Sequence, residues 1–309
     1  MRDCRNILNR IGKGPIVELC HVNHTKCSLL AKMENFNPSG SIKDVMALYM
    51  ISKAESRNEI NPGDKIIEVT TGNTGIAFAM ISALKGYKFT AVMPEHMSIE
   101  RRKIMEALGA NIMLTPAEED MKGAVECYKN LVAENPDAWL PNQFGNLDNI
   151  DAHRHITGRS ILEQINGNID AFIAGIGTGG TLLGVSRALR EWMPDVRIVA
   201  VEPEESAVMS GKKPELHDIQ GIGEGFIPEL VNMDEIDDVI TVKSNDAKSF
   251  ARKLAREEGL FVGVSSGANV LAALKMAERL ESESTDGEKK TIVTILPDSG
   301  ERYLSMNIF

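Results

Sequence analysis

Short hydrophobic runs alternate with amphipathic stretches along most of this chain of 309 residues. Each run has the length of a buried strand, and the stretches between runs place apolar residues three and four apart, as helices that cover a sheet do. This alternation predicts an α/β fold with mostly parallel, twisted sheets flanked by helices on both faces. The expected strands are 29–33, 65–69, 89–93, 111–114, 171–176, 198–201 and 291–296, and the expected helices are 43–57, 74–86, 98–108, 121–134, 181–193, 246–258 and 266–280.

Length and charge narrow the class of protein. At roughly 150 residues per domain, the length predicts two domains, each with its own core. The formal net charge is −10, which argues against a protein dedicated to nucleic acids or anionic membranes. The longest uncharged stretches, 171–186 among them, are too short to cross a bilayer. Residues 1–5 are charged and lead into no apolar core, so no secretory signal is expected, and four irregularly spaced cysteines indicate reduced thiols in the cytoplasm.

The segment 37–44 (NPSGSIKD) puts a turn and a capping residue, Ser41, directly before a helical run. Lys43 then falls in the first turn of a helix, near the positive end of the helix dipole. A cation is disfavoured there, so the site would lower the pKa of the amine and favour a nucleophilic or Schiff-base lysine. On these residues alone, an exposed lysine partnered by Asp44 is the alternative.

The segment 68–75 (EVTTGNTG) follows an expected strand and opens the next helix. Hydroxyl side chains and backbone N–H groups at a helix start suit a carboxylate or a phosphate. A capped helix whose turn needs Gly72 explains the same pattern.

The segment 175–181 (GIGTGGT) lies in a similar place, between a strand and a helix. Gly175, Gly177 and Gly180 satisfy the dinucleotide-binding pattern, and Glu202 ends the next strand at the distance expected of a ribose-binding acid. The competing interpretation is a cup for one phosphate at a helix N-terminus, with two threonines adding hydroxyl donors. Either interpretation predicts an anion site.

Two other regions have weaker patterns. In the segment 297–305 (PDSGERYLS), a serine at the carboxyl end of the last strand would face the ligand crevice, or Asp298 and Ser299 would cap a helix. Residues 137–151, rich in Asn, Pro and Gly, suit a crossing between domains.

No metal site is expected. The group Cys20, His21, His24 and Cys27 matches no common zinc spacing. His153 and its neighbour two residues later point in different directions on a helix, so they are interpreted as surface or domain-junction residues.

Taken together and in this order, these segments resemble the cysteine synthase and cystathionine β-synthase family of fold type II pyridoxal 5′-phosphate enzymes. The similarity extends to 97–102 (MSIERR), 143–146 (QFGN) and 221–228 (GIGEGFIP). The resemblance implies a two-domain, tryptophan synthase β-like α/β fold. Its smaller, mobile domain would be 45–147, and its larger, cofactor-binding domain would be 1–44 with 148–309.

The resemblance also implies roles for single residues. Lys43 would hold the cofactor as an internal aldimine and, once displaced by substrate, would remove the α-proton. Asn73 would bond to the ring hydroxyl. Ser299 would bond to the pyridine nitrogen and leave it neutral, which favours β-elimination. The phosphate would be held by Gly177, Thr178, Gly179, Gly180 and Thr181, and the substrate by Thr70, Thr71, Gly72, Thr74, Gln143 and Gly223.

The implied reaction is β-replacement on a serine- or cysteine-type amino acid through an aminoacrylate, with sulfide, a thiol or water as second substrate. The main interpretation is a cysteine synthase that converts O-acetylserine and sulfide into cysteine and acetate. Members of the family are typically homodimers, and the small domain closes over the bound carboxylate. A serine acetyltransferase is a candidate partner.

Glu224 departs from the family pattern, which commonly has alanine or tyrosine at this position facing the β-substituent of the substrate. A carboxylate there would repel hydrosulfide but could activate water or a thiol as a general base. The alternative function is therefore release of hydrogen sulfide from cysteine, or a cystathionine β-synthase-like reaction, with Glu224 as a second catalytic residue.

Two hypotheses from other classes remain. A dinucleotide-dependent oxidoreductase explains the glycine loop and Glu202 but leaves Lys43 and Ser299 without roles. The fold could also serve as a catalytically silent docking protein.

Overall fold

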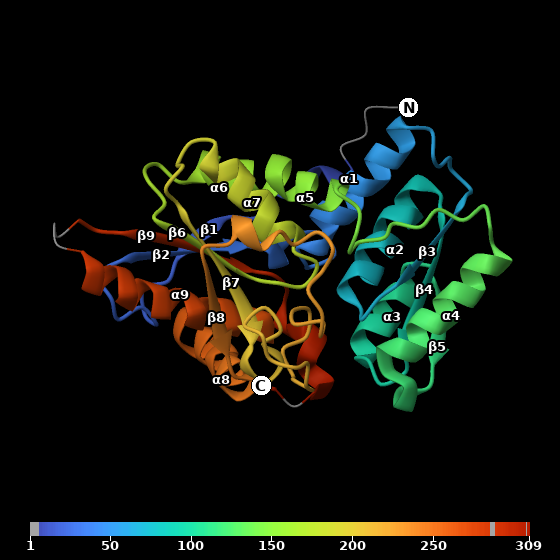
Figure 1. The fold of residues 1–309 in the computed structure, drawn as a ribbon. Coiled ribbons are helices and arrows are strands. Elements are labelled where there is room, and N and C mark those ends of the chain that lie inside the picture. The colour runs from blue at the N-terminus through green and yellow to red at the C-terminus, as the bar shows by residue number, and fades with distance from the viewer. Residues whose placement is uncertain (1–5, 285–287, 307) are drawn as a thin grey trace.

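The computed structural model describes residues 6–284, 288–306 and 308–309, and it contains two separate sheets (Figure 1). The first has the strand order β1-β2-β9-β6-β7-β8, and all neighbouring strands are parallel except the β1–β2 pair. The second has the order β3-β4-β5 and is entirely parallel. The strands are β1 (Ile16–Glu18), β2 (Ser28–Met33), β3 (Lys65–Val69), β4 (Lys88–Pro94), β5 (Asn111–Thr115), β6 (Ala171–Gly175), β7 (Arg197–Pro203), β8 (Asp238–Val242) and β9 (Thr291–Leu296).

Each sheet is covered by its own helices, and the two sheets with their helices form a larger and a smaller half of the molecule (Figure 1). The larger half is the six-stranded sheet with α5 to α7 on one face and α8 and α9 on the other; the smaller half is the three-stranded sheet with α2 to α4. Helix α1 lies between them and packs against α2 and α5. The helices are α1 (Lys43–Ser56), α2 (Asn73–Lys85), α3 (Ile99–Ala107), α4 (Asp120–Glu134), α5 (Asp148–Ala152), α6 (Arg159–Gln164), α7 (Gly180–Arg190), α8 (Ser244–Lys253) and α9 (Val264–Glu283).

Burial on both faces explains why the strand sequences are hydrophobic without alternation. In β6, Ile173 belongs to the core under α9, whereas its neighbour Phe172 belongs to the core under α7. In β3, Ile66 packs in the core with α2, and Ile67 faces α4. Successive side chains of a strand point to opposite faces, so each strand supplies two cores.

The predicted α/β class and the predicted strands and helices are confirmed, with ends that differ by a few residues. The sequence analysis missed β1 and β8, two edge strands that are short or begin with charge. It also missed α5 and α6, which are joined by a π-helix (His153–Gly158). Five- and six-residue helices are too short for their periodicity to stand out.

The predicted domain boundaries stay predictions, although the three-stranded sheet lies inside the range 45–147. The hydrophobic cluster of the smaller half also takes in Leu8, Ile11 and Ala152, which lie outside that range.

The sequence predicted no membrane-spanning segment and reduced thiols in the cytoplasm, and the structure bears on each prediction only in part. In the part of the chain that the structure describes, no helix is long and apolar enough to span a membrane. Cys20, Cys27 and Cys127 are free thiols. Cys4 and the charged segment 1–5 lie outside the described residues.

Candidate active site

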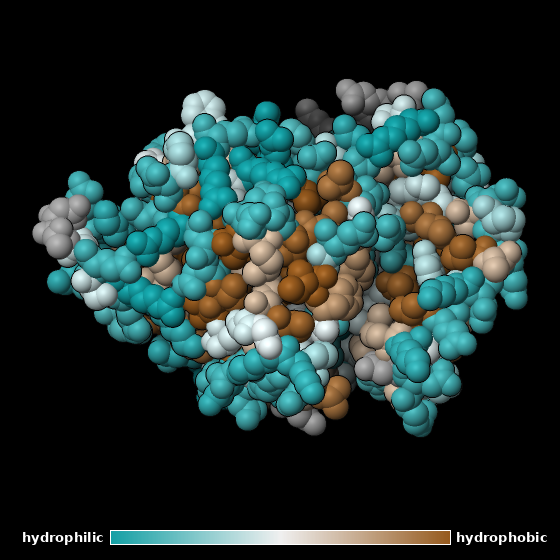
Figure 2. All heavy atoms as spheres, in the orientation of Figure 1, coloured by the Kyte–Doolittle hydropathy of each residue, from teal (hydrophilic) through white to brown (hydrophobic). Residues whose placement is uncertain are grey.

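A cavity lies where the two halves meet, at the carboxyl ends of β3, β6 and β9 and the N-termini of α1, α2 and α7. Figure 2 shows hydrophobic residues gathered along the line where the halves meet. The placement follows the rule for parallel sheets, in which ligands bind beyond the carboxyl ends of strands. Its lining residues include Lys43, Thr70, Thr71, Asn73, Thr74, Arg101, Gln143, Phe144, Gly177, Thr178, Gly179, Thr181, Glu224, Ser265, Asn269 and Asp298.

Lys43 is the first residue of α1 and lines both parts of this cavity. The loop before it is fixed from the C-terminal region: Ile42 N donates to Pro297 O at 2.8 Å, and the Arg302 guanidinium donates to the Gly40 carbonyl at 2.5 Å. Burial lowers the pKa of the Lys43 amine, although the carboxylates of Glu224 and Asp298 act in the opposite direction. A lowered pKa raises the fraction of neutral amine, the form that acts as a nucleophile or base.

Asn73 and Asp298 form a polar pair beside Lys43. Asn73 Nδ2 donates to Asp298 Oδ2 at 2.7 Å, and the Tyr303 hydroxyl donates to the same oxygen at 2.8 Å. Among the described residues, neither Asn73 Oδ1 nor Asp298 Oδ1 has a hydrogen-bond partner, although both are buried. Such unpaired atoms in a cavity are suited to a polar ligand.

The glycine loop between β6 and α7 forms a cradle with no room for side chains. A Cβ on Gly177 would meet the Gly221 carbonyl oxygen, and a Cβ on Gly180 would meet the Asn149 side chain. Gly179 has a φ of 87°, which favours glycine. Thr178 Oγ1 accepts from Asn149 Nδ2 at 3.0 Å and from Gly180 N at 3.3 Å. Gly177, Thr178, Gly179 and Thr181, at the start of α7, line the cavity, and the first N–H groups of a helix suit a phosphate.

The dinucleotide interpretation of this loop finds no support at Glu202. The buried Glu202 carboxylate accepts from Met209 N at 2.9 Å, from Ser210 N at 3.0 Å and from Ser210 Oγ at 2.5 Å. It is occupied in a turn and does not line the cavity.

Behind the cradle lies His153, which is buried, so its interpretation as a surface residue is wrong, whereas a place near the domain junction stays a prediction. His153 is 2% exposed, with Nδ1 3.0 Å from Thr157 Oγ1 and Nε2 3.3 Å from Thr181 Oγ1. Burial, together with the charge of Lys43, lowers its pKa to about 3. The missed signal was the helix 148–164, which turns this side chain inward.

The loop 70–74 gathers hydroxyl groups at the start of α2. Thr70 Oγ1 accepts from Gly72 N at 3.0 Å and from Gly75 N at 3.3 Å, so it fixes the loop itself. Thr74 Oγ1 donates to Gln143 Oε1 at 2.8 Å, which joins the loop to the connection between α4 and α5. Gly72, with a φ of 144°, shapes the turn and is not a lining residue.

Glu224 lies in the loop 221–225, which three glycines with positive φ shape: 92° at Gly221, 71° at Gly223 and 81° at Gly225. His217 fixes this loop, because its Nε2 donates to Gly223 O at 2.8 Å while its Nδ1 accepts from Ile219 N at 3.2 Å. Glu224 lines the cavity together with Lys43, whereas Gly223 shapes the loop without lining it. Burial raises the pKa of Glu224, opposed by the charge of Lys43.

Ser299 does not share the cavity of Lys43. It lines a separate hollow with Phe36, Glu100 and Phe261, and its backbone pairs with Val262. Successive residues of an extended segment point to opposite sides, so Asp298 enters the cavity and Ser299 points away. The serine in the cavity is Ser265, in the first turn of α9.

Arg101 is a cavity residue that the sequence analysis quoted only within a family motif. It is 2% exposed, and its Nη1 donates to Thr71 O at 3.3 Å and to Gln220 Oε1 at 2.5 Å. In the described ranges, no group of three or more His, Cys, Asp and Glu side chains is arranged to hold a metal ion.

A half-buried lysine with a lowered pKa, a glycine cradle at a helix start and unpaired polar atoms between them fit an enzyme that binds a phosphorylated aldehyde. Residues 7–298 match the model of the family described as pyridoxal-phosphate dependent enzyme. The chain belongs to this family, and its cofactor is pyridoxal 5′-phosphate.

Cysteine synthases and related enzymes are similar to this chain over nearly its whole length. A cysteine synthase of Staphylococcus aureus (strain N315) is 46% identical over 306 residues, covering 98% of this chain and 96% of that protein. The crystal structure of a cysteine synthase from Entamoeba histolytica has a TM-score of 0.93 at 42% identity, covering 100% of this chain and 91% of that one. A hydrogen sulfide-producing enzyme from Fusobacterium nucleatum has a TM-score of 0.91 at 37% identity, covering 97% of this chain and 100% of that one.

Proposed function

We propose that this protein is a cysteine synthase that replaces the acetate of O-acetylserine with sulfide. The observation that carries the proposal is the meeting of Lys43, the glycine cradle and the hydroxyl loop 70–74 in one cavity. The similarity over 98% of the chain to a cysteine synthase supports the same substrate class.

We assign the cofactor to the residues whose polar groups face the cavity. Lys43 would carry it, Asn73 Oδ1 would bond to its ring hydroxyl, and the cradle Gly177, Thr178, Gly179, Gly180 and Thr181 would hold its phosphate. For the ring nitrogen we propose Ser265 in place of Ser299, because Ser265 lines the cavity and Ser299 does not. When bound, pyridoxal phosphate supplies an electron sink that acidifies the α-proton of an amino acid.

The substrate α-carboxylate would bind at the hydroxyl loop. Thr71 lines the cavity at the N-terminus of α2, where backbone N–H groups and the helix dipole favour an anion. Thr74 and Gln143 hold each other by a hydrogen bond and complete the site. Thr70, occupied by backbone N–H groups, and Gly72 keep the loop in shape.

Lys43 Nζ would move the α-proton. Because burial lowers its pKa, a larger share of the amine is neutral near pH 7 than for an exposed lysine. The neutral amine accepts a proton and returns it as the ammonium form, which is general acid–base catalysis.

A comparison of three amino-acid substrates, each given separately, tests the proposal. Purified enzyme loaded with cofactor is given O-acetylserine, O-phosphoserine or serine, each with sulfide, and cysteine is measured. Fastest formation from O-acetylserine supports a cysteine synthase, and no cysteine from any of the three contradicts it. Ser265→Ala and Ser299→Ala form a matched pair, of which only the first is expected to change the absorbance of the bound cofactor.

A second candidate function is release of hydrogen sulfide from cysteine. It is favoured by Glu224, whose carboxylate lines the cavity with Lys43 and whose raised pKa makes it a stronger base than an ordinary glutamate. Glu224 would activate water or a thiol for addition. Cysteine alone should then yield sulfide, Glu224→Gln should suppress it, and Glu229→Gln, a nearby exposed carboxylate, should not. Equal sulfide from all three proteins excludes a role for Glu224.

We also propose a cytoplasmic homodimer in which the predicted smaller domain, residues 45–147, moves toward the larger one when substrate binds. The exposed Trp192 and Leu304, at 75% and 57%, are candidate subunit contacts. A serine acetyltransferase remains a candidate partner, and the acidic composition argues against nucleic acid or membrane as partners. Light scattering on the protein as it elutes from a size-exclusion column gives its mass, and a mass of one chain would contradict the dimer.

A further inference from the structure

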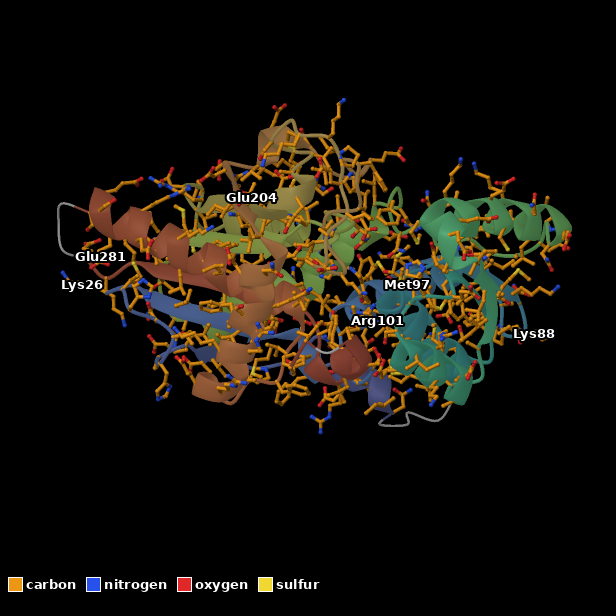
Figure 3. All side chains as sticks on the ribbon, turned by 90° about the horizontal axis from the view of Figure 1, so that it is seen from below. Lys26, Lys88, Met97, Arg101, Glu204 and Glu281 are labelled. Carbon is orange, nitrogen blue, oxygen red and sulfur yellow. The ribbon has the colours of Figure 1, made fainter. Side chains whose placement is uncertain are left out.

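The first turn of α3 connects the two halves of the molecule. It begins at Ser98, whose Oγ lies 3.0 Å from the carbonyl oxygen of Arg302, in the C-terminal segment of the larger half. The Glu100 carboxylate accepts from the backbone N–H and the hydroxyl of Ser305, both at 2.8 Å. Figure 3 labels Met97 and Arg101 at this boundary.

Arg101 makes contacts with both halves at once. Its Nη1 donates to the carbonyl of Thr71, in the hydroxyl loop of the smaller half, and to Gln220 Oε1, in the larger half. Its guanidinium carbon lies 5.0 Å from the ring centre of Tyr303, which also belongs to the larger half. One side chain therefore ties the carboxylate-binding loop to two residues across the boundary.

The burial of this guanidinium needs a reason. Arg101 is 2% exposed, and no carboxylate of a described residue forms an ion pair with it. Its Nε has no hydrogen-bond partner in the described part of the chain, and the side chain lines the cavity. An unpaired buried cation costs free energy. That cost falls when an anion binds at the adjacent Thr71 loop.

We propose that Arg101 is a positioning residue that couples binding of the substrate carboxylate at the Thr71 loop to docking of α3 on Gln220 and Tyr303. The inference rests on the proposed function, because it requires an amino acid whose carboxylate occupies that loop. An arginine suits the task, since its planar guanidinium donates in several directions and stacks on an aromatic ring. A lysine in its place would keep the charge but lose this geometry.

Two ligands that differ only at the carboxylate provide the test. L-Serine and L-serine methyl ester are titrated into the cofactor-loaded enzyme, and binding is followed by the absorbance of the cofactor. Arg101→Lys and Gln220→Ala should each weaken serine about 10-fold or more, the usual effect of losing a hydrogen bond to a charged group. Binding of the ester should change much less. Lys103→Ala, an exposed change on the same helix, is the control.

Amide hydrogen exchange over α3 supplies a readout that does not depend on turnover. Serine should slow exchange at residues 99–107 in the wild-type protein and leave it unchanged in Arg101→Lys. The double variant Arg101→Lys with Gln220→Ala should lose little more than either single variant, because both remove the same contact.

The outcomes separate the two levels of the proposal. Equal weakening of serine and ester in the variants, or undiminished preference for serine, overturns the coupling while the proposed function stands. Failure of the wild-type protein to prefer serine over its ester overturns the carboxylate site, and the coupling with it. Should Arg101→Lys not fold, Gln220→Ala alone decides between these results.

Discussion

Two walls of the cavity are built by different means. The glycine wall, residues 175–181, is formed by backbone that closely approaches Gly221 and Asn149, all within the larger half. The hydroxyl wall, residues 70–74 with Gln143, is formed by side chains and is held across the boundary by Arg101. A wall of close backbone contacts can hold a group permanently, whereas a wall held by a few side chains can release one. The difference suits a resident cofactor on one side and an exchanging substrate on the other.

The largest effect is expected from the residue that both walls share. Lys43→Ala removes the amine that moves the proton, so cysteine formation should fall by about 10³-fold or more. Because the glycine wall is intact, the variant should still bind pyridoxal phosphate in equilibrium dialysis. Lys88→Ala, an exposed lysine labelled in Figure 3, is the control. Near-normal turnover in Lys43→Ala would remove the basis of the proposed function.

Gly177→Ala tests the glycine wall. The added Cβ would meet the Gly221 carbonyl, a backbone atom that cannot turn aside. Overpacking of this kind costs about 1–3 kcal/mol, so cofactor affinity should fall by about 5- to 150-fold. The substrate KM of fully loaded enzyme should change little. Thr181→Ser, which keeps the hydroxyl, is the mild comparison, and unchanged cofactor affinity in Gly177→Ala would argue against a phosphate cradle.

His153→Gln probes the support behind the glycine wall through the dependence of stability on pH. The unfolded imidazole binds a proton below about pH 6.5, whereas the folded one does so only below about pH 3. Between these values the unfolded state holds more protons, so the free energy of unfolding decreases as the pH falls. At pH 5 this difference lowers the free energy of unfolding by about 2 kcal/mol relative to pH 8. Denaturant unfolding at pH 5 and pH 8 should show less acid sensitivity in His153→Gln than in the wild type. The exposed His24→Gln should match the wild type.

Gln143→Ala tests the hydroxyl wall and should have the smallest effect. It removes the acceptor of the Thr74 hydroxyl, which then loses its fixed direction. Loss of one such hydrogen bond near a charged ligand should raise the KM for O-acetylserine about 10-fold. Cofactor affinity should stay the same. A variant that loses cofactor instead of substrate would mean that the two walls are not independent.

The sequence predicted the parts of the site that depend on local patterns. Lys43, the loop 70–74 and the loop 175–181 each lie at the start of a helix after a loop or strand, where turn residues and hydroxyls are recognisable in order. It did not predict Arg101 as a cavity residue, because its partners Gln220 and Tyr303 are more than 100 positions away along the chain. It placed Ser299 in the cavity because a one-residue shift in an extended segment reverses the direction of a side chain.

The segment between α4 and α5, which leads from the smaller half to the larger one, also covers an edge of the smaller sheet. Trp139 N donates to Lys65 O at 2.9 Å, and Ile67 N donates to Trp139 O at 3.2 Å, so residue 139 pairs with the outer edge of β3. An open strand edge is a template for aggregation, and this pairing covers part of it. Four residues later the same segment delivers Gln143 to the cavity. An insertion between residues 139 and 143 would therefore expose an aggregation-prone strand edge and also displace Gln143, the proposed substrate-binding residue. Solubility and catalysis would both limit the length of this connection.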